Sequence, residues 1–153
     1  MKKILGIWFC GLSGAGKSYA SIFLEKKIKN SIKIEGDTVR KFFIYDPALG
    51  YTKKDRIKSA KRNLQIANFL IYEKKFPLVS NAYLNQNVVE LAKKENIKVI
   101  QIIRKEKVNV KFDNDEKNVL GRDIKSENLK CSKIINDDNF EKKLLKLINQ
   151  YLL

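Results

Sequence analysis

An apolar run leads into a glycine-rich segment at Ile7-Trp8-Phe9-Cys10-Gly11-Leu12-Ser13-Gly14-Ala15-Gly16-Lys17-Ser18. Its residues 11–18 match the phosphate-loop pattern G-x-x-x-x-G-K-[ST] at every fixed position. In such loops the glycines let backbone N–H groups point at phosphate oxygens, the lysine reaches the β- and γ-phosphates, and the serine hydroxyl ligates Mg²⁺. A simple glycine-rich turn would not require the Lys17-Ser18 pair. The stretch therefore predicts a nucleoside triphosphate site with Mg²⁺ at Ser18.

Apolar runs and helical patterns alternate outward from this loop. Apolar runs predict strands at residues 4–10, 32–35, 77–80, 99–103 and 132–136. Helical patterns cover about 17–30, 38–45, 88–95 and 140–152, and a turn is expected at 46–50. A further long helix is capped by Thr52, with a buried face made of Ile57, Ala60, Leu64, Ala67 and Ile71. Strands separated by helices favour a parallel sheet covered on both faces. We therefore predict an α/β chain with the three-layer P-loop NTPase fold, in which helices flank a five-stranded parallel sheet.

The predicted sheet places the candidate functional segments at one edge. Ligands of open parallel sheets bind beyond the carboxyl ends of the strands. We expect the loop at 11–18 to meet Glu35-Gly36-Asp37 and Ser80-Asn81 there, because each segment ends or directly follows a predicted strand.

Length and cysteine usage narrow the setting. The 153 residues suit a single domain, 1–153, with a buried core. No apolar run approaches the roughly eighteen residues that span a membrane, and the first residues show no signal-peptide pattern. Cys10 and Cys131 lie outside any metal-ligand spacing, and the chain contains no histidine, which excludes histidine triads and histidine metal sites. We expect a reduced, cytoplasmic protein without a membrane partner.

The net charge of +15 comes mainly from lysine. Nucleic-acid binding would call for basic residues clustered with exposed aromatic ones, whereas these lysines are scattered over predicted helix surfaces. We do not expect nucleic acid as the main partner, although a positive field would attract anionic nucleotides. A nucleotide-dependent nucleic-acid-binding module stays open as an alternative.

Three further motifs suggest a family. They are Glu35-Gly36-Asp37-Thr38-Val39-Arg40, Leu49-Gly50-Tyr51-Thr52-Lys53-Lys54-Asp55-Arg56 and the weaker Asn118-Val119-Leu120-Gly121-Arg122-Asp123-Ile124. With the phosphate loop, they resemble G-L-S-G-S-G-K-S, D-G-D-N-V-R, L-G-F-S-x-x-D-R and V-x-G-x-D-I of the adenylylsulfate kinases, in order and spacing over about residues 4–140. The resemblance implies an ATP-dependent phosphotransferase that phosphorylates the ribose 3′-hydroxyl of adenylylsulfate with MgATP.

The resemblance also implies roles on the acceptor side. Asp37, beside the catalytic Lys17, would accept or orient the proton of the acceptor hydroxyl. Arg40 and Arg56 would bind the acceptor's anionic group as guanidinium forks, and Tyr51 would stack on its base. The acceptor site would be completed by Ser59, Ser80 and Asn81. Asp37 could instead be a helix N-cap, the two arginines could be solvated, and Tyr51 could be a plug in a loop.

On the donor side, the resemblance implies ATP contacts from the whole phosphate loop. These residues are Gly11, Leu12, Ser13, Gly14, Ala15, Gly16, Lys17 and Ser18. A lid within 105–129 would cover the transferring phosphate and exclude water. Arg104 and Arg122 are its candidate phosphate contacts, and either could equally be a surface residue. The family often dimerises, so a homodimer is a further expectation.

Several positions depart from the family pattern. After its third strand the family has a serine-proline-aromatic-arginine stretch, and this chain has Ser80-Asn81-Ala82-Tyr83. The R-D-P-K-G-L-Y lid segment is absent, and Val119 falls near the lid phenylalanine that closes over the acceptor base. The acceptor therefore stays open between adenylylsulfate and cytidine diphosphoramidate, which related kinases phosphorylate in bacterial capsule synthesis. A small-metabolite P-loop kinase is the other enzymatic alternative.

Overall fold

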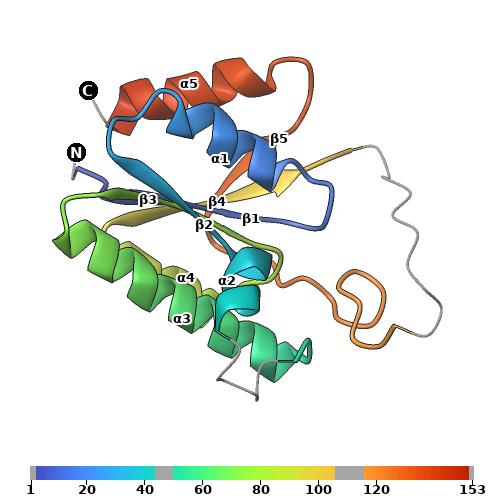
Figure 1. Ribbon diagram of the computed structural model, residues 1–153. Coiled ribbons are helices and arrows are strands. Elements are labelled where there is room, and N and C mark those ends of the chain that lie inside the picture. Colours follow the sequence, from blue (N-terminus) through green and yellow to red (C-terminus); the bar gives the residue numbers. More distant parts are fainter. Residues whose placement is uncertain (1–2, 44–49, 106–115, 152–153) are drawn as a thin grey trace.

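The computed structural model describes residues 3–43, 50–105 and 116–151 (Figure 1). In chain order its elements are β1 (Gly6–Cys10), α1 (Lys17–Glu25), β2 (Ser31–Glu35), α2 (Gly36–Phe42), α3 (Lys53–Tyr72), β3 (Phe76–Asn81), α4 (Gln86–Lys94), β4 (Ile97–Ile103), β5 (Ser132–Ile135) and α5 (Phe140–Tyr151).

The strands form one five-stranded sheet in the order β2-β3-β1-β4-β5, and every neighbouring pair is parallel. Helices α1 and α5 cover one face, and α3 and α4 cover the other (Figure 1). The predicted α/β fold with a five-stranded parallel sheet between helical layers is therefore confirmed. Strand β1 lies at the centre, so the loop that follows it opens at the middle of the sheet edge.

The burial of β1 explains its unbroken apolar sequence. Side chains alternate between the two faces of a strand. Trp8 and Cys10 accordingly pack into the core under α3 and α4, and Ile7 and Phe9 pack into the core under α1 and α5. Burying a large apolar side chain contributes about 1.5–3 kcal/mol, so the two cores fix the strand from both sides.

Some element boundaries differ from those predicted. Helix α1 ends at Glu25 rather than near residue 30, because the chain turns there and reaches φ 59° at Asn30, which favours asparagine. Helix α4 begins two residues early, at Gln86, because the Asn85 side chain accepts a hydrogen bond from Val88 N. Helix α2 begins at Gly36 instead of residue 38. The predicted end of that helix, the turn at 46–49 and residue 152 lie outside the described residues.

Helix α3 begins at the predicted cap, but its buried face is wider than predicted. Thr52 caps it as predicted, since its hydroxyl oxygen accepts a hydrogen bond from Asp55 N at 3.2 Å. Ala60, Leu64 and Ala67 are buried, as the helical stripe predicted. The buried face is wider than that stripe, because it also includes Ser59 and Asn63.

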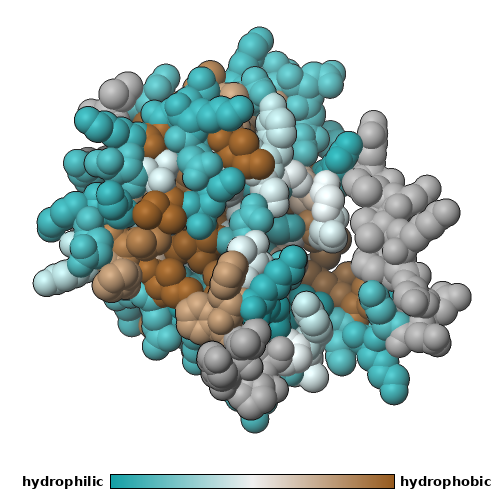
Figure 2. Space-filling view, viewed as in Figure 1, coloured by the Kyte–Doolittle hydropathy of each residue, from teal (hydrophilic) through white to brown (hydrophobic). Residues whose placement is uncertain are grey.

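One face of the molecule combines hydrophilic and hydrophobic surface. The face drawn in Figure 2 is largely hydrophilic, with hydrophobic atoms gathered over the part where β2 lies in Figure 1. Strand β2 is an edge of the sheet, and its Ile32 is 37% exposed. Among the described helices, none is long and apolar enough to cross a membrane.

Candidate active site

The phosphate loop connects β1 to α1 and is shaped by close backbone contacts. Gly11 has φ 146°, and a Cβ there would lie 2.5 Å from Ile102 O. Gly16 has φ 109°, and a Cβ there would lie 2.5 Å from Asn136 Nδ2. A side chain at either position would collide with a neighbour and force an unfavourable backbone. These two glycines are therefore required by the loop's geometry as well as by its sequence pattern.

A second contact fixes the loop from the end of β5. The Asn136 side chain donates a hydrogen bond to Ala15 O at 2.9 Å. Asn136 was not predicted as a site residue, although it directly follows a strand at the edge where the other candidates lie. The carboxyl-end rule alone could have marked it.

Lys17 is held within the loop. Its Nζ donates to Leu12 O at 2.9 Å. Burial lowers the pKa of Lys17, while the nearby carboxylate of Asp37 raises it. Lys17 and Asp37, the two predicted catalytic residues, line the same cavity.

Asp37 lies in the first turn of α2, not at its cap. The N-cap position belongs to Glu35, so the alternative reading of Asp37 as a helix N-cap is wrong. The helix can begin close to β3 because Gly36 has no side chain: a Cβ there would lie 2.8 Å from Asn81 Nδ2. This close approach leaves Asp37 exposed at the mouth of the site.

Two arginines meet at one aromatic ring. The guanidinium carbons of Arg40 and Arg56 lie 4.5 and 5.4 Å from the ring centroid of Tyr51. Arg40 also donates to Gly50 O at 2.6 Å, and Arg56 Nε donates to Tyr51 O at 3.0 Å. Burial and then the charge of Arg40 lower the pKa of Arg56. Two like charges held this close create a strongly positive site suited to an anion.

These groups share a cavity of about 720 Å³. The predicted residues on its wall are Ser13, Gly14, Gly16, Lys17, Ser18, Asp37, Arg40, Tyr51, Arg56, Ser80 and Asn81. The structure also places Tyr19, Glu35, Gly36, Ala82, Tyr83 and residues 116–120 there. The fold thus brings the predicted donor loop and most of the predicted acceptor residues to one space.

A second cavity, of about 510 Å³, adjoins the phosphate loop. Gly11, Leu12 and Ala15 line it, together with Ser13 and Gly14, which line both cavities. Arg104 lines it as well, and its Nη1 donates to Gly14 O at 3.3 Å. Arg104 therefore lies at the phosphate loop, and its contact with the transferring phosphate stays a prediction.

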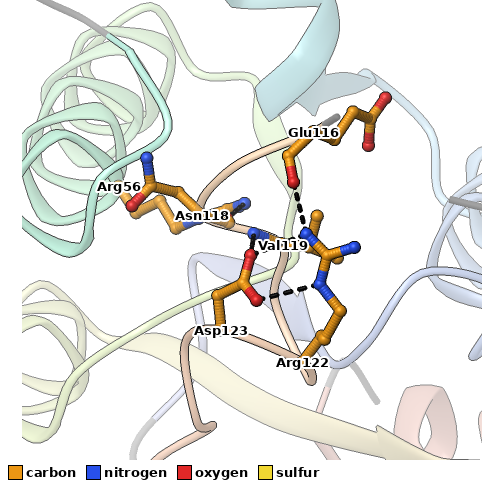
Figure 3. A network of polar contacts seen from close by, with 6 residues as sticks. All are labelled: Arg56, Glu116, Asn118, Val119, Arg122 and Asp123. Atoms are coloured by element: carbon orange, nitrogen blue, oxygen red, sulfur yellow. Dashed lines mark hydrogen bonds and ion pairs between the residues drawn. The ribbon is translucent and has the colours of Figure 1, made fainter. Parts of the chain in front are cut away.

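Two predicted residues lie apart from these walls. Ser59 is 1% exposed inside α3 and lines neither cavity, and its hydroxyl has no hydrogen-bond partner within the described ranges. Arg122 pairs with Asp123 and donates to Glu116 O (Figure 3). Its side chain is also outside both walls. The structure thus places neither Ser59 on the acceptor wall nor Arg122 on a wall of the phosphate-loop cavities.

Hydrogen bonds from the core fix Ser80 and Asn81, the two polar residues at the end of β3. Asn81 Oδ1 accepts hydrogen bonds from Trp8 Nε1 at 3.1 Å and from Asn63 Nδ2 at 3.0 Å. Ser80 Oγ lies 2.9 Å from Ser21 Oγ, within hydrogen-bond distance. Both residues are therefore fixed parts of the cavity wall.

Tyr83 lines both cavities and was not among the predicted site residues. Its hydroxyl donates to Glu127 Oε1 at 2.9 Å, and Glu127 Oε2 accepts from Gln86 N at 3.1 Å. Burial and this carboxylate raise the pKa of Tyr83 to about 12, so the ring stays neutral. The only signal in the sequence was its departure from the family pattern.

Comparisons with known sequences point to one family. A family model described as adenylylsulphate kinase matches residues 3–130. An adenylyl-sulfate kinase of Halothermothrix orenii is 37% identical over 73 residues, which cover 45% of this chain and 38% of that protein. A probable adenylyl-sulfate kinase of Pseudomonas aeruginosa is 43% identical over 68 residues, which cover 42% of this chain and 31% of that protein. The match thus spans less than two thirds of these relatives.

Solved structures share the fold. The Mycobacterium tuberculosis APS kinase CysC, in complex with AMPPNP and APS, superposes with a TM-score of 0.77 at 20% identity, covering 97% of this chain and 98% of that one. A sugar kinase from Janibacter sp. HTCC2649 has a TM-score of 0.61 at 10% identity, covering 97% and 94%. Because kinases of different names share it, the fold alone does not define the acceptor. The family model matches well over half of the chain, and the protein therefore belongs to the adenylylsulfate kinase family.

Proposed function

We propose that the chain is a kinase that transfers the γ-phosphoryl group of MgATP to the ribose 3′-hydroxyl of a nucleotide acceptor resembling adenylylsulfate. One observation carries this proposal: a single cavity is lined by the phosphate loop, by Asp37 and by the arginine pair Arg40 and Arg56. A donor loop, a carboxylate and an anion site are the parts that phosphoryl transfer to an anionic alcohol requires.

The donor half would hold the triphosphate through backbone and side chain together. Lys17 would exchange Leu12 O, its present partner, for β- and γ-phosphate oxygens. The oxygens of Ser18 and Asp37 line the same cavity, and they suit Mg²⁺, which takes few protein ligands and keeps water and phosphate oxygens. When bound, the ion would neutralise charge on the transferring phosphate. Arg104 would contact the nucleotide from the second cavity, and its hydrogen bond to Gly14 O supports this role.

The reaction itself needs one proton acceptor. The ribose hydroxyl oxygen would form a bond to the γ-phosphorus while the bond from that phosphorus to the β–γ bridging oxygen breaks. Asp37 would take or orient the hydroxyl proton, and ADP would leave with the electron pair of the broken bond. Its exposure in the cavity opposite Lys17 supports this role.

The acceptor half would bind the anionic group between Arg40 and Arg56. Their shared contact with Tyr51 supports a second role for that residue, since cation–π contacts orient guanidinium groups. Tyr51 is still 51% exposed, so part of its ring is accessible to the acceptor base.

A kinase for cytidine diphosphoramidate is the second candidate. The segment 116–120 supplies the cavity wall with Val119, an aliphatic residue, and with no aromatic ring. An aliphatic wall gives less stacking than the lid phenylalanine of the family pattern would, and a pyrimidine loses less by that change than a purine. The acceptor in this case is also a nucleoside with a short anionic chain.

An acceptor panel tests the proposal. ADP release would be followed with MgATP and, separately, adenylylsulfate, cytidine diphosphoramidate, shikimate and a sugar acid. We expect acceptor-dependent turnover with one of the two nucleotides, and turnover only with shikimate or the sugar acid would overturn the nucleotide assignment. Binding to single-stranded nucleic acid that weakens steeply with salt, without turnover of any acceptor, would favour the binding-module alternative.

A further inference from the structure

A turn within residues 116–124 is organised around one carboxylate (Figure 3). Asp123 Oδ2 accepts a hydrogen bond from Val119 N at 2.9 Å. The Arg122 guanidinium binds the same carboxylate as a fork, with Nε 2.8 Å from Oδ1 and Nη2 2.9 Å from Oδ2. Arg122 Nη2 also donates to Glu116 O. The contacts from backbone and side chain therefore meet at Asp123.

The turn contacts both halves of the site. Asn118 lies in this segment, and its carbonyl oxygen accepts a hydrogen bond from Arg56 Nη2 at 3.0 Å. On the donor side, Gly121 packs beside the phosphate loop, where a Cβ would lie 3.6 Å from Leu12 Cδ2. The position of the turn is thus coupled to the orientation of an acceptor arginine.

Backbone and side-chain hydrogen bonds hold this segment together with the buried side chain of Val119. Val119 is 5% exposed, but Gly121, Arg122 and Asp123 are exposed. Charge-assisted hydrogen bonds are roughly twice as strong as neutral ones. The Arg122 guanidinium and the Val119 N–H hold the pKa of Asp123 down to about 2, so the carboxylate is ionised throughout the neutral range.

We propose that Asp123 is a positioning residue for acceptor binding, because it holds the turn that presents the Asn118 carbonyl to Arg56. Asp123 itself lines neither cavity in the described part of the chain, so it acts through Arg56. Arg56 is oriented by two carbonyl oxygens, those of Tyr51 and Asn118. The inference rests on the proposed function, since it takes Arg56 to bind the acceptor. It gives Arg122 a part in holding the turn instead of a contact to the transferring phosphate.

Steady-state kinetics of Asp123→Ala test this inference. Loss of the carboxylate releases the turn and with it the Asn118 carbonyl. The KM for the acceptor should rise about tenfold, the size expected for one hydrogen bond to a charged group. The KM for ATP and kcat should change less than about twofold, because the phosphate loop and Asp37 are untouched.

Two conservative variants sharpen the test. Asp123→Asn keeps an oxygen that accepts from Val119 N and should restore part of the acceptor KM. Arg122→Gln leaves the Val119 contact intact and should raise the acceptor KM by less than Asp123→Ala. If Asp123→Ala does not fold, these two variants decide: an acceptor KM equal to that of the unmodified chain in both would overturn the inference.

A control separates positioning from general stability. Glu25→Ala removes an exposed ion pair to Lys33, 3.3 Å long and outside both cavities, and should leave both KM values unchanged. A folded Asp123→Ala with a lower melting temperature but an unchanged acceptor KM would contradict the inference. If the unmodified chain turns over no nucleotide acceptor, the proposed function fails and this inference falls with it. If the unmodified chain turns over a nucleotide acceptor but Asp123→Ala leaves the acceptor KM unchanged, only this inference is overturned.

Discussion

The donor and acceptor halves of the site are built in different ways. In the donor half, Gly11 and Gly16 lie against Ile102 O and Asn136, and the loop is fixed by backbone geometry at the centre of the sheet. In the acceptor half, half-buried arginine side chains are held by hydrogen bonds to backbone carbonyl oxygens, as Arg56 is by those of Tyr51 and Asn118. A donor site made of packed backbone tolerates little change. An acceptor site made of surface contacts can change its ligand without unfolding the chain.

The largest effect should come from the residue that faces both halves. Asp37→Ala should lower kcat by about 10²- to 10⁴-fold, the usual contribution of a positioned proton acceptor. ATP affinity should fall far less, because Lys17 and the loop backbone are unchanged. Stopped assays for kcat and calorimetry for ATP check these two values. Near-normal turnover would remove Asp37 from the chemistry.

A substitution of glycine can strain the backbone of the donor half directly. Gly16→Ala places a Cβ 2.5 Å from Asn136 Nδ2 at φ 109°, and such strain costs about 1–3 kcal/mol. ATP affinity should therefore fall by about tenfold or more, with a lower melting temperature. Gly121→Ala is the matched variant: it has φ 90°, but its Cβ would meet Leu12 only at 3.6 Å. That change should affect the acceptor KM and spare ATP affinity. Equal ATP losses in both variants would contradict the division into halves.

In the acceptor half, Arg56→Ala should raise the acceptor KM by about 10- to 100-fold, as expected for lost hydrogen bonds to an anion. Arg56→Lys should raise it less, since the charge stays while the fork is lost. Lys58→Ala, an exposed change on the same helix outside both cavities, is the control. An Arg56 effect confined to the KM for ATP would place this arginine in the donor half instead.

The smallest expected effect concerns the reactivity of two cysteines, Cys10 and Cys131. Cys10 directly precedes the phosphate loop and is buried, and its thiol donates a hydrogen bond to Ile100 O at 3.8 Å. The neighbouring thiol of Cys10, a backbone hydrogen bond with Gln101 and the nearby cations Lys133 and Lys93 lower the pKa of Cys131 below that of an ordinary thiol. A thiol with a lowered pKa ionises at lower pH, so Cys131 should be alkylated at a lower pH than a free cysteine. Mass spectrometry after iodoacetamide treatment, with Cys131→Ser as control, checks this; equal labelling of Cys10 would show that the donor half is open.

The same division explains what the sequence could predict. The phosphate loop has all of its determinants within residues 11–18, and Asp37 and Arg40 follow a strand within one short motif, so local patterns were sufficient. The sheet, its helical layers and the Thr52 cap followed from periodicity in the same way.

Contacts between distant segments could not be predicted from a single sequence. Asn136 with Ala15 and Tyr83 with Glu127 each join residues far apart in the chain. The carboxyl-end rule predicts which loops share the sheet edge, but no local pattern encodes which side chains pair there. Ser59 shows a different limit: it lies next to the predicted apolar stripe, and α3 buries a face wide enough to include it. Ser59 was predicted as an acceptor contact from the family resemblance, and the structure buries it inside α3.

The most direct measurement is the position of the transferred phosphate. The chain would be incubated with MgATP and adenylylsulfate, and in parallel with cytidine diphosphoramidate, and each product would be examined by mass spectrometry and ³¹P NMR. We expect one acceptor to gain a single phosphoryl group on its ribose 3′-oxygen and Asp37→Ala to abolish this product. Transfer to another position, or phosphorylated product only from an acceptor that is not a nucleotide, would contradict this expectation.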